Sequence, residues 1–201
     1  MNPQFLFGYG SLINQESRAL TGITKNPLAV KVSGFERSWC VQAPTMHLTG
    51  LGVIPNPLAW CNGVLVELDQ DQIMAFDERE LGGSNAGYAR VEIPRKAITG
   101  LHAPETGRIW TYVVKKILLP TKSYPITQSY LDVILSGCLA FGESFALDFI
   151  QTTAGWEHPW MDDRQAPRYV RHLRDDKLNI MVDDLLKQTL GLSFAQRTTG
   201  F

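Results

Sequence analysis

The chain has 201 residues, 44% of them hydrophobic and 19% charged, which is typical of a globular protein long enough to form one sizeable core. Its 19 Lys and Arg residues against 20 Asp and Glu leave a formal net charge of -1, so no overall positive field attracts nucleic acid. No apolar run reaches the roughly 20 residues that cross a bilayer, and Met1 is followed by no secretory leader pattern. These features predict a cytoplasmic protein with neither a nucleic-acid nor a membrane partner.

The first half of the chain has the pattern of a β-rich structure. The apolar run at residues 5–7 predicts a strand that ends in the glycine-bracketed turn Gly8-Tyr9-Gly10-Ser11. Alternating apolar residues predict a second strand over residues 28–41, where Gly34 shifts the alternation as a β-bulge would. Residues 63–68 predict a further strand.

A helix is predicted over residues 70–81. Asp69 is a suitable N-cap residue, and Gln72 follows three positions later, which is the spacing of a capping box. The pair Gly82-Gly83 then ends the helical pattern. Two more strands follow at residues 88–93 and 109–114, so strands surround one helix instead of alternating with several. This order disfavours a doubly wound parallel sheet.

Helical spacing of apolar residues returns after Thr127. It predicts a helix that contains Tyr130 and Ile134, a second helix after Gly142, and a final helix over residues 177–190. We expect a folded domain over residues 1–154 and a C-terminal extension, residues 155–201, packed on it. No internal repeat is present.

The cysteine and histidine positions give no pattern of a metal site. Cys40, Cys61 and Cys138 are far apart and form no CxxC pair, so buried thiols are expected in preference to a disulfide framework or a zinc site. The four histidines also lack the spacing of metal ligands. No metal is therefore predicted.

Glu80 is the candidate catalytic acid or base. On the predicted helix, Ile73, Phe76 and Glu80 share one face, which places a carboxylate on an apolar stripe. Burial disfavours the charged form and raises the pKa of a carboxyl group, and a Glu with a pKa of about 6–7 suits proton transfer at neutral pH.

A purely structural role is the alternative for Glu80, because a glutamate at the end of a short helix commonly pairs with a neighbouring arginine, here Arg79 or Arg90. The other two acidic residues of this turn, Asp77 and Glu78, fall on other faces of the helix. We expect both to be solvated and to have no functional role.

The turn Tyr9-Gly10-Ser11-Leu12 is the candidate ligand-binding loop. Glycines on both sides of Tyr9 let backbone N–H groups approach an anion with no Cβ in the way, and Ser11 adds a hydroxyl donor. A tight turn without a ligand is the alternative, because the spacing of a Rossmann or P-loop fingerprint is missing.

Five motifs follow one another along residues 5–150. They are a YGS turn, a helix ending in D-x-R-E, a GY strand, an aromatic strand and a helix after a proline: Tyr9-Gly10-Ser11, Asp77-x-Arg79-Glu80, Gly87-Tyr88-x-Arg90, Trp110-Thr111-Tyr112 and Pro125-x-x-x-x-Tyr130. In this order and spacing the chain resembles the gamma-glutamylcyclotransferase superfamily, which includes the ChaC-type enzymes.

The resemblance implies an α+β fold in which helices pack outside a small, twisted antiparallel β-barrel. It also implies conversion of a small-molecule γ-glutamyl amide or peptide to 5-oxoproline and the free amine, with no cofactor. Glu80 would be the catalytic residue, and the substrate would contact Tyr9, Gly10, Ser11, Leu12 and Tyr112.

Three questions stay open at this point. A non-catalytic binding module on the same barrel is the alternative to an enzyme. Asn14-Gln15 stand where ChaC proteins carry an aromatic residue, so glutathione is not singled out as the substrate, and neither the leaving amine nor the oligomeric state is determined. In the extension, Trp156, Trp160 and Asp163-Arg164 predict a packing or interaction role, with a lid as the alternative.

Overall fold

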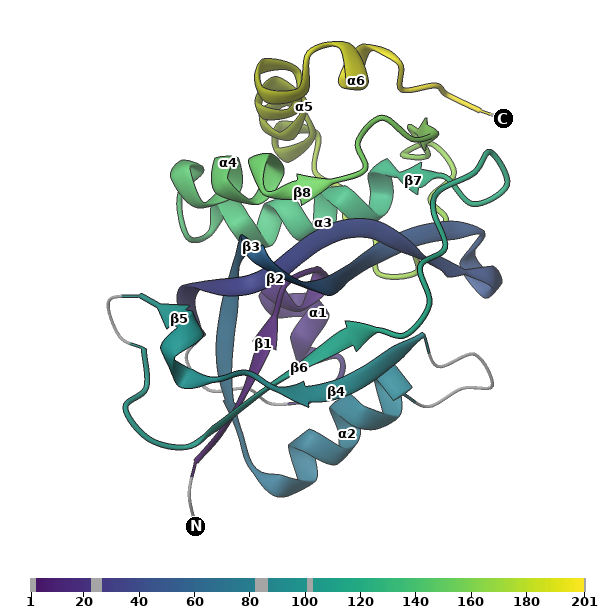
Figure 1. The fold of residues 1–201 in the computed structure, drawn as a ribbon. Helices are drawn as coiled ribbons and strands as arrows, with labels where there is room; N and C mark the ends of the chain where they lie inside the picture. Colours follow the sequence, from purple (N-terminus) through teal and green to yellow (C-terminus); the bar gives the residue numbers. More distant parts are fainter. Residues whose placement is uncertain (1–2, 23–26, 82–86, 101–102, 201) are drawn as a thin grey trace.

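The computed structural model describes residues 3–22, 27–81, 87–100 and 103–200, and it has a mixed α+β architecture (Figure 1). Within these ranges, seven strands form one curled sheet. Their order across it is β4 (Tyr88–Glu92), β6 (Arg108–Val114), β1 (Gln4–Gly8), β3 (Leu48–Leu68), β2 (Leu28–Ala43) and β5 (Ile98–Thr99), with β8 (Thr153–Ala154) paired to β2.

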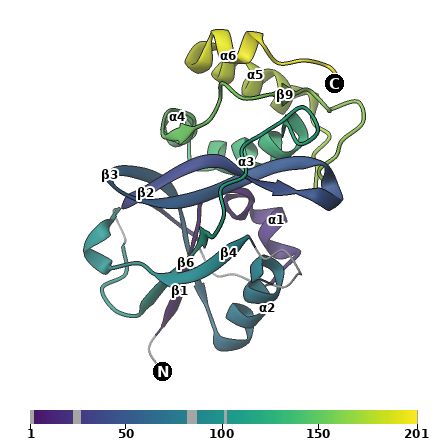
Figure 2. The ribbon, with the colours of Figure 1, turned by 45° about the vertical axis from the view of Figure 1, so that its right-hand side comes forward.

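Helices lie outside this sheet, in two groups. The chain forms α1 (Gln15–Ala19), α2 (Gln70–Leu81), α3 (Gln128–Leu139), α4 (Glu143–Gln151), α5 (Asp176–Leu190) and α6 (Leu192–Ala195), with 3-10 turns η1 (Ser11–Ile13), η2 (Pro44–Met46) and η3 (Arg95–Ala97). Figures 1 and 2 show α3 to α6 stacked on one side of the β2–β3 ribbon and α2 on the other side, next to β4. A separate two-stranded sheet joins β7 (Ile126–Thr127) to β9 (Trp160–Met161).

The expected α+β class, with a barrel-like sheet and outer helices, is confirmed. Strand β3 is antiparallel to both β1 and β2, and β4 is antiparallel to β6. The sheet is mixed, however, because β6 runs parallel to β1 and also forms a bridge with β3. Pairing of β6 with two strands curls the sheet toward a barrel.

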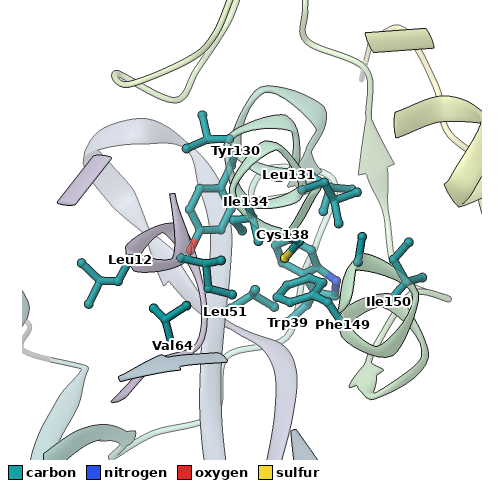
Figure 3. Close-up of a cluster of buried hydrophobic side chains, with 14 of the residues drawn as sticks. Leu12, Trp39, Leu51, Val64, Tyr130, Leu131, Ile134, Cys138, Phe149 and Ile150 are labelled. Carbon is teal, nitrogen blue, oxygen red and sulfur yellow. The ribbon is translucent and has the colours of Figure 1, made fainter. Parts of the chain in front are cut away.

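The central residues of strand β1, Phe5 to Phe7, are all apolar because both faces of the sheet are covered there. Alternate side chains of a strand point to opposite faces. Phe5 and Phe7 belong to a cluster inside the curl, whereas Leu6 belongs to a second cluster under the helices. In that second cluster, shown in Figure 3, Trp39 and Leu51 of the sheet pack with Tyr130, among others.

Strand β3 is longer than the sequence predicted, since residues 63–68 form only its final part. The missed part contains Pro55 and Pro57, which lack the N–H group that a sheet ladder requires. Ladder pairs with β2 stop at Pro55 and resume at Trp60, so the residues between them bulge out of the ladder. The bulge lies opposite Gly34, where the sequence predicted an irregularity.

The helix over residues 70–81 is confirmed, including its capping box. The Asp69 carboxylate accepts from the Gln72 N–H at 2.9 Å, and the Gln72 side chain accepts from the Asp69 N–H at 2.9 Å. The predicted stop at Gly82-Gly83 lies outside the described residues. In the described ranges no helix is long and apolar enough to cross a membrane.

The three cysteines are free and buried, as the sequence predicted. Burial raises the pKa of the Cys40 thiol to about 12, and that of Cys138 to about 12. These thiols therefore stay protonated and pack as small apolar side chains.

Candidate active site

A small cavity of about 40 Å³ lies between the turn that follows β1 and the C-terminal end of α2. It brings together all the site residues predicted from the sequence: Glu80, Tyr9, Gly10, Ser11, Leu12 and Tyr112. This volume is far below the roughly 300–1,000 Å³ of ligand sites, so the cavity can hold part of a substrate but not the whole molecule.

A larger groove of about 540 Å³ adjoins this cavity. Ser11, Glu80, Tyr88 and Tyr130 line both spaces, so Glu80 stands where the cavity meets the groove. The groove volume falls in the range of ligand sites, roughly 300–1,000 Å³. Together they form a site with a narrow polar end and a wider open end.

Four lining residues were not singled out as site residues from the sequence: Phe7, Leu51, Tyr88 and Tyr130. Tyr88 and Tyr130 belong to the GY and proline motifs, which gave a usable signal, although no role was assigned to either. Leu51 lies in the part of β3 that the prolines concealed, so no local pattern pointed to it.

The turn that forms the cavity depends on its two glycines. A Cβ at Gly8 would lie 2.7 Å from the Leu12 Cβ, and a Cβ at Gly10 would lie 3.2 Å from the Tyr130 hydroxyl. In the 3-10 turn η1, the N–H groups of Ser11 and Leu12 precede the first bond of the turn, which Ile13 makes to Gly10. These two N–H groups are the donors the turn can offer to an anion.

A buried arginine supports the turn from behind. Arg18, fully buried on α1, donates to the carbonyl oxygens of Leu12 at 2.6 Å and Ile13 at 2.7 Å. Asn14 caps α1 by accepting from the Ser17 N–H at 2.8 Å. The backbone of the turn is therefore held by hydrogen bonds from within the protein.

Glu80 has the environment of a carboxyl with a perturbed pKa. Ile73 and Phe76 on the same face are buried, and the Glu80 side chain is 19% exposed. Burial raises the pKa of Glu80, while the charges of Arg79 and Arg171 partly oppose this rise. The Arg79 pairing considered from the sequence also occurs, at 3.1 Å, so the apolar face and the ion pair coexist.

The expectation that Asp77 is simply a solvated charge is wrong. Its carboxylate accepts from the Tyr112 hydroxyl at 2.9 Å and pairs with Arg90 at 2.5 Å. These partners lie on β6 and β4, strands that come later in the chain and pack beside α2. Asp77 thus orients a tyrosine that lines the cavity.

The hydroxyls of Tyr9 and Tyr88 are also committed to the protein. Tyr9 donates to the Tyr112 carbonyl at 2.6 Å, and Tyr88 donates to the Leu51 carbonyl at 2.8 Å. Burial, together with the nearby Glu80 charge, raises the pKa of both phenols well above 10.0. The cavity wall is therefore neutral, and Glu80 is the one carboxylate among its described lining residues.

The side chains that ligate metals do not gather in the described part of the chain. No group of three or more His, Cys, Asp or Glu residues there is arranged to hold a metal ion.

Fold and site together define a barrel-like α+β protein in which one largely buried carboxyl and a glycine-containing turn line the same cavity. The family model described as "Gamma-glutamyl cyclotransferase, AIG2-like" matches residues 6–132, which is more than half of the chain. The chain therefore belongs to the AIG2-like gamma-glutamyl cyclotransferase family. No curated protein sequence matches it.

Solved structures share the fold at low sequence identity. One titled gamma-glutamyl cyclotransferase is 14% identical, with a TM-score of 0.58 over 90% of this chain and 98% of that one. An uncharacterized protein from Homo sapiens, also 14% identical, has a TM-score of 0.59 over 90% of this chain and 99% of that one. YkqA from Bacillus subtilis, 15% identical, has a TM-score of 0.57 over 75% of this chain and 54% of that one. At these identities the likeness concerns the fold.

Proposed function

We propose that this protein is a γ-glutamylcyclotransferase, which converts a γ-glutamyl amide or peptide to 5-oxoproline and the free amine. The observation that carries the proposal is the meeting of the Glu80 carboxyl and the Tyr9–Leu12 turn around one cavity, in a chain of this family. A polar turn beside a carboxyl of raised pKa is what a proton-transfer reaction on an anionic small molecule requires.

In the reaction, the substrate α-amine attacks its own γ-carbonyl carbon and closes a five-membered ring. A C–N bond forms within the ring, and the bond to the leaving nitrogen then breaks. Both reacting groups belong to one molecule, so correct folding of the substrate supplies much of the acceleration, with effective molarities of about 10⁵–10⁸ M.

Glu80 would move the protons. The α-ammonium loses one proton before its nitrogen attacks and a second as the ring amide forms, and both protons are taken up by the leaving nitrogen, which departs as an ammonium ion at neutral pH. Glu80, at the junction of cavity and groove, is placed to take the first proton and return it to the leaving nitrogen. Its raised pKa favours both steps at neutral pH, because carboxylate and carboxylic acid are then closer in free energy.

The turn would bind the charged part of the γ-glutamyl group. The N–H groups of Ser11 and Leu12, with the Ser11 hydroxyl, can hold the α-carboxylate or the oxyanion that develops on the γ-carbonyl. Arg79 donates to the Ser11 hydroxyl oxygen at 3.1 Å and so leaves the hydroxyl proton for the ligand. Tyr9 and Tyr112 would contribute ring surfaces, since their hydroxyl protons are already used.

A mass-spectrometric screen for 5-oxoproline release tests this function. The panel contains γ-glutamyl dipeptides, glutathione and γ-glutamyl amines, each incubated with the purified protein and with Glu80→Gln. We expect release from at least one class, and a loss of about 10²–10⁴-fold in Glu80→Gln, the usual contribution of general acid–base catalysis. Binding of these compounds without any 5-oxoproline would instead favour the non-catalytic binding module.

A further inference from the structure

The C-terminal segment reaches the candidate site. Tyr169, Val170 and Arg171 line the groove beside Glu80, although they lie beyond the residues matched by the family model. The groove therefore has one wall that the family motifs do not describe.

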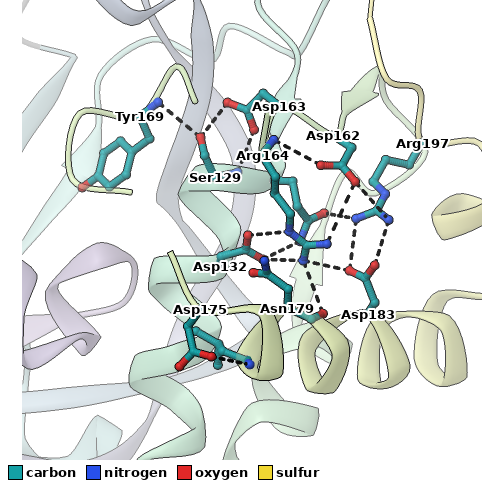
Figure 4. Close-up of polar contacts among 12 residues, drawn as sticks. Ser129, Asp132, Asp162, Asp163, Arg164, Tyr169, Asp175, Asn179, Asp183 and Arg197 are labelled. Carbon is teal, nitrogen blue, oxygen red and sulfur yellow. Dashed lines mark hydrogen bonds and ion pairs between the residues drawn. The ribbon is translucent and has the colours of Figure 1, made fainter. Parts of the chain in front are cut away.

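This wall is held firmly in place. The buried Asp163 carboxylate accepts from the N–H and the hydroxyl of Ser129 at 2.7 and 2.6 Å, and from the Arg168 N–H at 2.8 Å. The Tyr169 N–H reaches the Ser129 hydroxyl oxygen at 3.2 Å, and the Tyr169 ring stacks edge-on against Tyr130, with centroids 4.8 Å apart. Figure 4 shows the hydrogen bonds that join Asp163 and Tyr169 to Ser129 at the start of α3.

A second set of ion pairs secures the same segment further along. Arg164 binds Asp132 of α3 at 2.8 Å and Asp183 of α5 at 2.8 Å, and Arg197 binds Asp183 at 3.0 Å (Figure 4). Residues on both sides of Arg171 are thus fixed to helices. The Arg171 side chain is presented to the groove by a rigid support.

The two arginines of the groove differ in their remaining hydrogen-bonding capacity. Arg79 contacts Glu80, Ser11, Thr21 and the Ser17 carbonyl, which together engage all three of its nitrogens. Arg171 donates to the Ser17 carbonyl at 2.9 Å, its one acceptor among the described residues. A guanidinium carries five N–H donors, so Arg171 has donors left for a ligand.

The charge and polarity of the groove indicate which kind of ligand group the remaining N–H donors of Arg171 bind. Among the described lining residues, Arg79 and Arg171 stand against the single carboxylate of Glu80, so an anionic ligand is favoured. The part of the groove formed by the end of β2, η2 and the start of β3 includes the apolar side chains of Val41 and Met46. An apolar side chain beside a carboxylate fits both features.

We infer that Arg171 is a specificity-determining residue, which binds the carboxylate of a leaving amino acid whose apolar side chain lies along the β2–β3 wall. This inference rests on the proposed function and defines its substrate class as γ-glutamyl dipeptides with an apolar second residue. The C-terminal segment is then part of the substrate site and not merely a packing extension.

Two substrates that differ only in this carboxylate test the inference. They are γ-glutamyl-leucine and γ-glutamyl-3-methylbutylamide, which has the same side chain and no carboxylate on the leaving part. A hydrogen bond to a charged group predicts a kcat/KM about 10- to 100-fold higher for the dipeptide. Arg171→Gln should abolish this preference, and Arg171→Lys should restore part of it. Arg174→Gln, an exposed arginine outside the groove, should preserve it.

The two kcat/KM values are measured on one protein sample, so any loss of folded protein cancels in their ratio. An equal fall in kcat/KM for both substrates in Arg171→Gln would overturn the inference, because Arg171 would then only fasten the segment to Ser17. A preference that survives Arg171→Gln would overturn it as well.

Calorimetric binding separates this inference from the proposed function, because it requires no turnover. Both compounds are titrated into Glu80→Gln and into Glu80→Gln/Arg171→Gln. Tighter binding of the dipeptide that disappears with Arg171 supports the inference even if no 5-oxoproline forms, in which case the proposed function alone fails. Equal binding of the two compounds to Glu80→Gln overturns the inference whether or not the enzyme is active.

Discussion

The Tyr112 hydroxyl donates to Asp77 at 2.9 Å, one turn of α2 before Glu80. The hydroxyl proton of Tyr112 is therefore used in a hydrogen bond within the protein, although the Tyr112 ring lines the cavity. Asp77 is in turn held by Arg90, so a strand residue, a helix residue and a cavity residue are linked. This link positions the wall opposite the N-terminal turn.

We predict that Tyr112→Phe lowers stability more clearly than activity. Removal of one hydrogen bond to a charged acceptor costs about 1–2 kcal/mol, because Asp77 keeps Arg90 and is partly exposed to water. The ring remains, so kcat/KM for 5-oxoproline formation should fall less than tenfold. Denaturant unfolding and steady-state kinetics check this. A hundredfold loss of activity at unchanged stability would mean that the phenol acts on the substrate directly.

The pKa of Glu80 predicts a pH-dependent effect of Glu80→Gln on stability. Burial raises this pKa above 4.5 in the folded protein, so folding is favoured by protonation of Glu80. That contribution is fully present below the unfolded pKa and is lost as the pH rises through the folded value. Glu80→Gln should therefore gain stability relative to the wild type between acidic and neutral pH.

Melting temperatures from pH 4 to pH 8 measure this difference, with Glu78→Gln, at an exposed position of α2, as the matched control. If the ion pair with Arg79 outweighed the effect of burial on the Glu80 pKa, Glu80→Gln would lose stability relative to the wild type as the pH rises. That opposite slope would contradict the raised pKa.

Gly10→Ala should block the cavity without unfolding the protein. The added methyl would lie 3.2 Å from the Tyr130 hydroxyl and 3.8 Å from the Leu51 Cβ, inside a space of only about 40 Å³. We expect kcat/KM to fall at least tenfold, the effect of about 1.4 kcal/mol, with a small change in melting temperature.

Gly22→Ala is the control for this change. Its added methyl would make an ordinary contact, 3.7 Å from the Phe76 ring, away from the cavity. Normal activity of Gly10→Ala would show that the cavity is not used.

The buried thiols predict slow alkylation of the native protein. With the pKa of Cys40 and Cys138 raised to about 12, almost no thiolate exists at pH 7.5, and neither side chain is accessible. Mass spectrometry after iodoacetamide treatment should find these cysteines unmodified in the folded protein and fully modified in denaturant. Rapid modification of the native state would show that the helices open above the sheet.

The parts of the site that are local in sequence were predictable. The face shared by Ile73, Phe76 and Glu80 follows from helical geometry alone, and the Tyr9–Leu12 turn follows from its glycines. Asp77 was assigned wrongly, because its partners lie 13 and 35 positions later in the chain. Arg171 gave no local signal at all.

The fold shows the same limit. Strands β1 and β6 and helix α2 have clear periodic patterns, whereas the long strand β3 was concealed by two prolines that a bulge accommodates. Neither the parallel pairing of β1 with β6 nor the curl of the sheet can be derived from periodicity, because both depend on contacts between distant segments.

The pairing of β1 with β6 also constrains how the chain folds. Strands β2 and β3 are joined through η2 and can pair as a local hairpin. Pairing of β1 with β6 must instead close a loop of about 100 residues, which costs more conformational entropy. We expect pulsed hydrogen exchange during refolding to protect the β2–β3 amides first, and earlier protection of β1 would refute this order. The cavity needs the β1 turn, α2 and β6 together, so a newly made chain would become able to bind its ligand only at the last stage of folding.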